Sequence, residues 1–242
     1  MEDNIILEKL NLFGLTRQEA GIYLCLCQNG ELTGYEVAKL TGISRSNVYS
    51  GLAGLADKGA AYQAEGNASK YVAVPVEEFC ANKLRSLEEE KAYLVKHMPK
   101  CKEAEIGYIT IEGYRNIRDK ILYMIKSAKK RIYLSASSQF IEPLTEELEA
   151  VTEKNIKLVL ITDREPDSEK VRQGSLCYLS ESRDDNVRLI IDSQLALTGK
   201  LTGEKSDTCL YTGQEHFIQI FKDALRNEML LIDLKKNGGK NE

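Results

Sequence analysis

Residues 45–50, which read RSNVYS, bring together side chains that can form hydrogen bonds with the edges of nucleic-acid bases. Arginine pairs with guanine, asparagine pairs with adenine, and serine can bond to either base. Lys70 lies further along the chain, where a lysine can meet a backbone phosphate. These residue types predict an interface with double-stranded DNA, whose members are Arg45, Ser46, Asn47, Tyr49, Ser50 and Lys70.

The cysteines are not spaced for metal binding. Six are scattered along 242 residues, and Cys25 and Cys27 form a lone Cys-x-Cys with no second pair at zinc-site spacing. The chain also has no glycine-rich phosphate loop and no Gly-x-Ser-x-Gly nucleophile elbow. We therefore expect reduced, buried cysteines, no metal, no cofactor and no catalytic residues.

Two short helices are expected to precede the predicted interface. The first spans residues 16–28, where Thr16 and Glu19 have the spacing of a capping box. The second spans residues 31–42, with Thr33 as its cap and Gly42 as its end. Helical spacing places one set of apolar side chains inward: Ala20, Tyr23, Leu24 and Cys27 in the first helix, and Val37 and Leu40 in the second.

The interface itself falls on a third helix, which we expect Ser44 to cap and Gly59 to end. Val48, Leu52 and Leu55 are spaced i, i+4, i+7 and form its buried stripe, so the polar residues face outward. Two short strands follow, in residues 60–65 and 70–74, joined by a GNAS turn at residues 66–69. Three helices and a hairpin predict a winged helix-turn-helix domain over residues 1–76, whose third helix enters the major groove.

The charge of this segment leaves a second interpretation open. Residues 1–76 hold six basic and eight acidic residues, a net charge of −2, whereas neutralisation of phosphates supplies much of the affinity for DNA. A winged helix that docks to another protein, without binding DNA, would have the same pattern.

Residues 5–100 resemble the TrmB family of transcriptional regulators. The resemblance is carried by an opening GLT followed by EA and Tyr23, by GISRSNVYSGLAGLADKGA at residues 42–60, and by KYVAVPVEEF at residues 70–79. The residues that fit the family pattern are Gly42, Ile43, Arg45, Ser46, Val48, Tyr49, Leu52, Leu55, Gly59, Tyr71 and Pro75. The resemblance implies a regulator that binds DNA.

Residues 77–100 predict a connecting helix that dimerises. Cys80, Leu84, Leu87, Lys91, Leu94 and Met98 alternate at spacings of four and three, the pattern of a short coiled coil. A homodimer would place two recognition helices on half-sites about one turn of DNA apart. The alternative is a single amphipathic helix lying on its own domain.

Residues 105–236 alternate strand and helix patterns and predict an α/β domain. Strands are expected at residues 106–111, 131–137, 156–162 and 187–192, with weaker ones near 194–200 and 207–212. Helices are expected at residues 114–130, at 141–155 with Asn155 as a left-handed stop, and at 214–228. In the last helix the residues expected to face inward are Phe217, Ile220, Phe221, Ala224 and Leu225.

This second domain resembles, more loosely, the phospholipase D-like regulatory domain of TrmB-type proteins. Catalytic members of that fold attack a phosphodiester with a histidine in an H-x-K-x4-D motif. Neither His97 nor His216 begins that motif, and the segment IDSQLALTGKL at residues 191–201 has no histidine. A phosphodiesterase is therefore the less favoured alternative, and we expect no enzyme activity.

The carboxyl ends of the expected strands carry hydroxyl, carboxylate and guanidinium groups, which suit a sugar or polyol. The residues are Ser135, Ser137, Ser138, Asp163, Arg164 and Asp192. The family resemblance points to sugars in some members, although each residue could equally be an ordinary loop or cap residue.

No run of 18 apolar residues occurs, and the first residues, MEDNIILEKL, lack the basic flank of a signal peptide. Together with these patterns, the family resemblance implies a cytoplasmic, dimeric transcriptional regulator that responds to a small-molecule effector and does not contact membranes. Its fold class is α/β overall: a winged helix-turn-helix, a connecting helix and a phospholipase D-like α/β domain.

Overall fold

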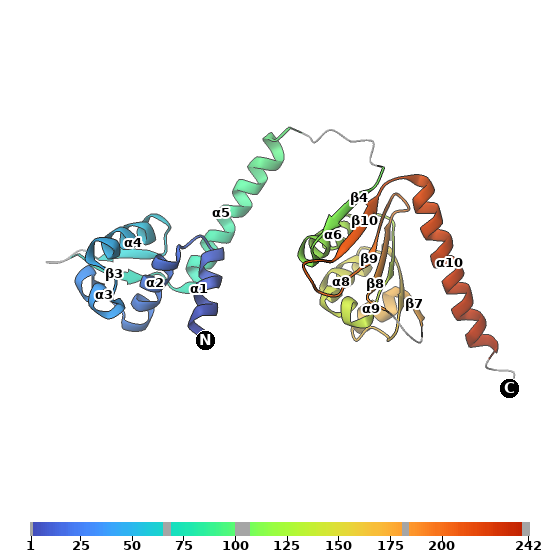
Figure 1. The fold of residues 1–242 in the computed structure, drawn as a ribbon, viewed down its shortest axis with the longest axis horizontal. Helices are drawn as coiled ribbons and strands as arrows, with labels where there is room; N and C mark the ends of the chain where they lie inside the picture. The colour runs from blue at the N-terminus through green and yellow to red at the C-terminus, as the bar shows by residue number, and fades with distance from the viewer. Residues whose placement is uncertain (1, 65–68, 100–106, 181–183, 239–242) are drawn as a thin grey trace. The chain divides into compact units, whose positions relative to one another are not determined.

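The chain divides into two compact units, Met1–Cys101 and Lys102–Glu242 (Figure 1). The structure is a computed structural model, and it describes residues 2–64, 69–99, 107–180 and 184–238. No helix in these ranges is both long and apolar enough to cross a membrane. Each unit has a hydrophobic core of its own.

The first unit is a winged helix-turn-helix followed by a long helix. Its three-stranded antiparallel sheet has the order β1-β3-β2, and β1 is a two-residue strand that the sequence pattern does not reveal. The elements are α1 (Glu2–Leu12), α2 (Arg17–Asn29), β1 (Leu32–Thr33), α3 (Gly34–Thr41), α4 (Arg45–Asp57), β2 (Ala61–Ala64), β3 (Lys70–Ala73) and α5 (Val76–His97). The GNAS turn lies largely outside the described residues.

Local capping explains where these helices begin and end. Both α2 and α3 start with complete capping boxes, Thr16 with Glu19 and Thr33 with Glu36. Gly42 ends α3 in the left-handed conformation, with φ of 70°. The expected caps of α2 and α3 are therefore confirmed, but the one expected for α4 is wrong in part. Ser44 occupies the cap position, yet its side chain makes no capping hydrogen bond.

The core of the first unit contains the predicted stripe of α4. Val48, Leu52 and Leu55 are fully buried, together with Tyr23 and Phe79. Two inward assignments are wrong, because Leu40 is 56% exposed and Cys27 is also exposed. Val37 of α3 is buried as expected, together with Gly34, and the buried side of α2 also includes Ile22, Cys25 and Leu26.

The described residues of the second unit form a seven-stranded sheet with the order β4-β10-β9-β8-β5-β6-β7. The strands are β4 (Ile109–Glu112), β5 (Arg131–Ser135), β6 (Lys157–Thr162), β7 (Ser175–Leu179), β8 (Asn186–Ile191), β9 (Leu195–Lys200) and β10 (Thr208–Thr212). Strands β5, β6 and β7 are parallel, and the other pairings are antiparallel. The mixed α/β fold class is confirmed, and Asn155 adopts the expected left-handed conformation.

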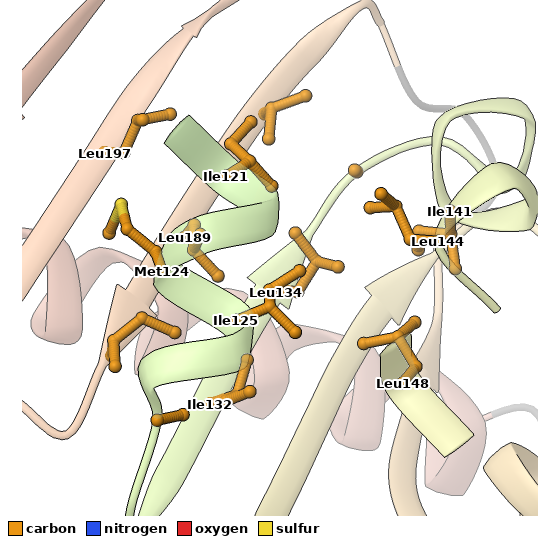
Figure 2. Close-up of a cluster of buried hydrophobic side chains, with 14 of the residues drawn as sticks. Ile121, Met124, Ile125, Ile132, Leu134, Ile141, Leu144, Leu148, Leu189 and Leu197 are labelled. Atoms are coloured by element: carbon orange, nitrogen blue, oxygen red, sulfur yellow. The ribbon is translucent and has the colours of Figure 1, made fainter. Parts of the chain in front are cut away.

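Helices cover both faces of this sheet. One face packs against α6 (Tyr114–Ser127), α7 (Ser138–Ile141), the 3-10 turn η1 (Glu142–Leu144), α8 (Thr145–Glu153) and α9 (Glu169–Gly174). Figure 2 shows this core, in which Ile121, Met124 and Ile125 of α6 lie on Ile132 and Leu134 of β5.

The other face of the sheet packs against α10 (Glu215–Gly238). Its buried positions are Ile218, Leu225 and Ile232, spaced seven residues apart. The inward assignments of Ile220 and Ala224 are wrong, since both are exposed, Ile220 by 63%. Helical spacing identifies a stripe, but the neighbouring sheet decides which stripe is buried.

Candidate functional site

The five predicted interface residues of α4 all lie on its exposed side. Val48, Leu52 and Leu55 turn the opposite side into the core, so the polar residues are presented to solvent from a rigid helix. The exposed residues are Arg45, Ser46, Asn47, Tyr49 and Ser50. The helix can therefore offer guanidinium, amide and hydroxyl groups to a surface laid against it.

Two glycines explain how closely α4 packs against α2. A Cβ atom added to Gly51 would lie 2.5 Å from Cδ1 of Ile22, and one added to Gly54 would collide with the Glu19 carboxylate. A glycine inside a helix costs about 1 kcal/mol relative to alanine. At these two positions the missing side chain leaves room for the Ile22 and Glu19 side chains, which would have to shift if a Cβ were present.

Arg45 and Tyr49 are both held by α3. The Arg45 guanidinium lies 4.5 Å from the centre of the Tyr35 ring, a cation–π contact. The Tyr49 ring lies over Gly34, where an added Cβ would come within 2.6 Å of its Cε1 atom. Half of Tyr49 remains exposed, so its ring both packs on α3 and borders the polar surface.

Lys70 is exposed at the start of β3, and its Nζ lies 3.6 Å from a carboxylate oxygen of Glu31. Lys58 donates to Glu19 at 2.5 Å, and Glu19 is only 8% exposed. Burial opposes ionisation of Glu19, but hydrogen bonds from Lys58 and Thr16 outweigh it and lower the pKa of the carboxyl. Both lysines therefore already have carboxylate partners within the unit.

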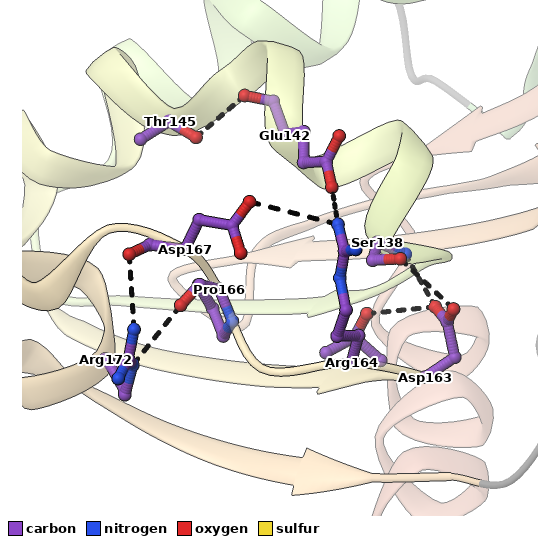
Figure 3. Close-up of polar contacts among 9 residues, drawn as sticks. Ser138, Glu142, Thr145, Asp163, Arg164, Pro166, Asp167 and Arg172 are labelled. Atoms are coloured by element: carbon purple, nitrogen blue, oxygen red, sulfur yellow. Dashed lines mark hydrogen bonds and ion pairs between the residues drawn. The ribbon is translucent and has the colours of Figure 1, made fainter.

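Part of the predicted effector site comes together where β5 and β6 end (Figure 3). The Asp163 carboxylate accepts from the Ser138 backbone N–H at 2.6 Å and from its hydroxyl at 3.1 Å. Burial disfavours the charged form of Asp163, but these bonds and one from Thr162 hold its pKa below the usual value. Arg164 pairs with Glu142 and lies 3.9 Å from Asp167.

This cluster leaves little room for a ligand. Its polar groups bind one another, and the cavity beside them measures about 10 Å³, too small to hold even a sugar ring. Ser135 is completely buried, and Ser137 caps α7 by accepting from the Phe140 N–H.

Asp192 lies at the opposite end of the strands from Ser138 and Asp163. Because β8 runs antiparallel to β5, its carboxyl end meets the amino end of β5. The Asp192 carboxylate accepts from the backbone N–H groups of Lys129, Lys130 and Arg131. Burial alone would raise the pKa of this carboxyl, but the three bonds lower it. Asp192 thus fixes the start of β5 and does not join Ser138 and Asp163.

A larger cavity of about 270 Å³ lies between α10 and the sheet, where no site was predicted. Tyr133 and Ile190 line it from the strands, and Leu225 and Met229 line it from α10. Its polar lining residues are Gln219, Lys222, Asp223 and Arg226. No motif signals such a site, since it depends on which side of α10 faces the sheet.

The two histidines belong to different units of the chain. His97 ends α5 and stacks on Tyr93 at 4.3 Å, whereas His216 lies in the first turn of α10, in the other unit. Within the part of the chain that the structure describes, no group of three or more His, Cys, Asp or Glu side chains could hold a metal ion.

Two sequence profiles match the chain, one in each unit. The profile described as "Sugar-specific transcriptional regulator TrmB" matches residues 10–77. The profile described as "Transcriptional regulator TrmB, EBD N-terminal subdomain" matches residues 107–224.

Two curated relatives are similar to part of the chain. The protein YrhO of Bacillus subtilis (strain 168) is 32% identical over 166 residues, which cover 66% of this chain and 59% of YrhO. The "HTH-type sugar sensing transcriptional regulator TrmBL1" of Pyrococcus furiosus is 30% identical over 173 residues, which cover 66% of this chain and 48% of TrmBL1. The chain thus spans about half the length of these relatives.

Solved structures with similar folds include TrmBL2, an archaeal chromatin protein, at 19% identity and a TM-score of 0.46, covering 94% of this chain and 98% of TrmBL2. They also include Nuc of Salmonella typhimurium, a phospholipase D family member, at 15% identity and a TM-score of 0.39, covering 50% of this chain and 93% of Nuc.

Both units carry TrmB signatures. The chain belongs to the TrmB family of transcriptional regulators.

Proposed function

We propose that this chain is a sequence-specific DNA-binding transcriptional regulator whose affinity for DNA is controlled by a small-molecule effector. The observation that carries the proposal is the division of α4 into a closely packed side and an exposed side with Arg45, Ser46 and Asn47. A recognition helix needs this division, because a rigid scaffold must hold its base-reading groups in register. Family membership supports a role in transcriptional regulation, and we propose that the chain acts in the cytoplasm.

We expect the purified chain to bind duplex DNA from upstream of its own gene more tightly than scrambled duplex of the same composition. Fluorescence anisotropy at two salt concentrations measures this, because contacts to phosphates weaken with salt for every sequence whereas base contacts keep the preference. Equal binding to both duplexes that disappears at higher salt would contradict the proposal. It would favour the protein-docking alternative, with which the net charge of −2 over residues 1–76 is consistent.

We further propose that two chains pair through α5. Leu84, Leu87, Leu94 and Met98 repeat at heptad spacing along or just after this helix, and each is more than half exposed. A second copy of the helix would cover this seam, in the way that coiled coils bury their apolar positions. Cys80, at the start of the seam, is partly buried in the first unit's own core.

Replacing Leu87 with lysine is expected to weaken the dimer by about 2 kcal/mol or more, because a charge would be buried in the seam. Sedimentation equilibrium of the full chain measures the dissociation constant. Val95→Lys is the matched control, since Val95 is exposed on the same helix but lies outside the seam. Equal effects of both changes, or a monomeric wild-type chain, would refute pairing through α5.

A further inference from the structure

We propose that the cavity between α10 and the sheet binds a phosphorylated sugar or polyol of about hexose size. This inference deepens the proposed function, on which it rests, by naming the class of effector and its binding site. The cavity of about 270 Å³ lies just below the roughly 300–1,000 Å³ of ordinary ligand pockets. It can therefore hold a small metabolite but not a nucleotide.

The floor of the cavity is apolar and rigid. Tyr133 of β5 and Ile190 of β8 are directly opposite each other in the antiparallel pairing, on the sheet face that α10 covers. Leu225 and Met229 close the cavity from the helix, and Leu225 is almost fully buried. An aromatic ring beside aliphatic side chains suits the C–H face of a sugar, in line with the apolar lining of most small-molecule sites.

The wall of the cavity carries two cations, Lys222 and Arg226, spaced one helical turn apart on α10. Neither side chain forms a hydrogen bond or ion pair with another described residue. Lys222 is also partly buried, which places part of its side chain against the cavity. A phosphate group can accept hydrogen bonds from both side chains at once.

Acceptors for hydroxyl groups lie on the same wall. Gln219 donates to the Asp223 carboxylate at 2.9 Å, which leaves oxygen atoms of both residues able to accept. A site that offers both cations for a phosphate and acceptors for hydroxyl groups should bind a phosphorylated sugar more tightly than a simple anion or a neutral sugar. In the comparably sized cavity beside α8, by contrast, Lys126 is already paired with Glu147 at 3.2 Å.

Isothermal titration calorimetry of the full chain with glucose 6-phosphate, fructose 6-phosphate and ribose 5-phosphate tests the proposal, with glucose and inorganic phosphate as comparisons. We expect at least one sugar phosphate to bind, and each of Lys222→Gln and Arg226→Gln to weaken it about tenfold or more through loss of a charged hydrogen bond. Lys157→Gln, an exposed lysine at the start of β6, should leave binding unchanged. Unchanged melting temperatures will show that the variants are folded.

Three results would overturn the proposal: no binding by any of the sugar phosphates, equal binding by inorganic phosphate, or binding that neither α10 substitution weakens. Anisotropy with operator DNA separates this outcome from a failure of the proposed function. A chain that binds its operator but no sugar phosphate remains a regulator without this site. If the chain binds a sugar phosphate but no DNA, the proposed binding site is supported and the proposed regulatory function is contradicted.

Discussion

Replacing Arg45 or Asn47 with alanine is expected to weaken binding to the preferred DNA site by about 1–3 kcal/mol each, or about 5- to 150-fold in dissociation constant. Both side chains are exposed in the first turn of α4, where a recognition helix contacts base edges. Neither supports the core, so the fold should be unaffected. Fluorescence anisotropy with the preferred duplex and with base-substituted duplexes measures the loss and shows which base each residue reads.

Lys70→Ala is the control for this experiment, because a lysine that meets only phosphate should weaken binding to every sequence about equally. Its effect should be modest, since Lys70 already has Glu31 as a partner at 3.6 Å. The base-reading role would be rejected if the Arg45 and Asn47 variants lost affinity equally for preferred and random DNA. Arg45 also contacts the Tyr35 ring, so Tyr35→Ala should reproduce part of the Arg45 effect by leaving the guanidinium less well oriented.

Leu52→Ala is expected to lower the free energy of unfolding of the first unit by about 2–5 kcal/mol, because it removes buried methyl groups and leaves a cavity. Leu52 is fully buried in the core of the first unit. Since the chain has two units, hydrogen–deuterium exchange of peptides from residues 17–57 measures this loss better than a single denaturation curve.

Leu40→Ala makes the same chemical change on the neighbouring helix and should cost less than about 0.5 kcal/mol, because Leu40 is largely exposed. The pair of variants therefore tests the packing of α3 directly. Equal destabilisation by both would mean that α3 packs with the register expected from the sequence, with Leu40 inward.

The reasons for success and failure of the sequence predictions differ between elements. The capping boxes at Thr16 and Thr33 depend on residues three apart, so they could be predicted from local sequence. The inward side of α10 depends on a sheet assembled from strands far apart in the chain. Ile220 and Ile218 fit a helical stripe equally well, and only the packing against Tyr133 and Ile190 buries Ile218. No strand is expected from the sequence at β7, SLCYL, which lies at the edge of the sheet and pairs only with β6 among the described strands.

The same contrast holds for the candidate sites. The exposed side of α4 could be predicted because it lies on one helix with a clear apolar stripe. The prediction of the effector residues assumes that the carboxyl ends of the strands all lie at the same end of the sheet. This assumption fails for Asp192, because β8 is antiparallel to β5. The cavity under α10 joins residues of two strands and a distant helix, a combination that no local pattern encodes.

The position of β4 at the edge of the second sheet affects how the chain folds during synthesis. Strand β4 pairs with β10, with Glu112 opposite Thr208, so the partner is made long after β4 itself. The core of the first unit, by contrast, is complete once Phe79 has left the ribosome. Until β10 follows, β4 presents unpaired backbone groups beside the exposed Tyr108 and Ile109, and such strand edges promote aggregation. The order of the strands thus makes the second unit, and not the winged helix, the part of the nascent chain whose strand edges stay unpaired longer.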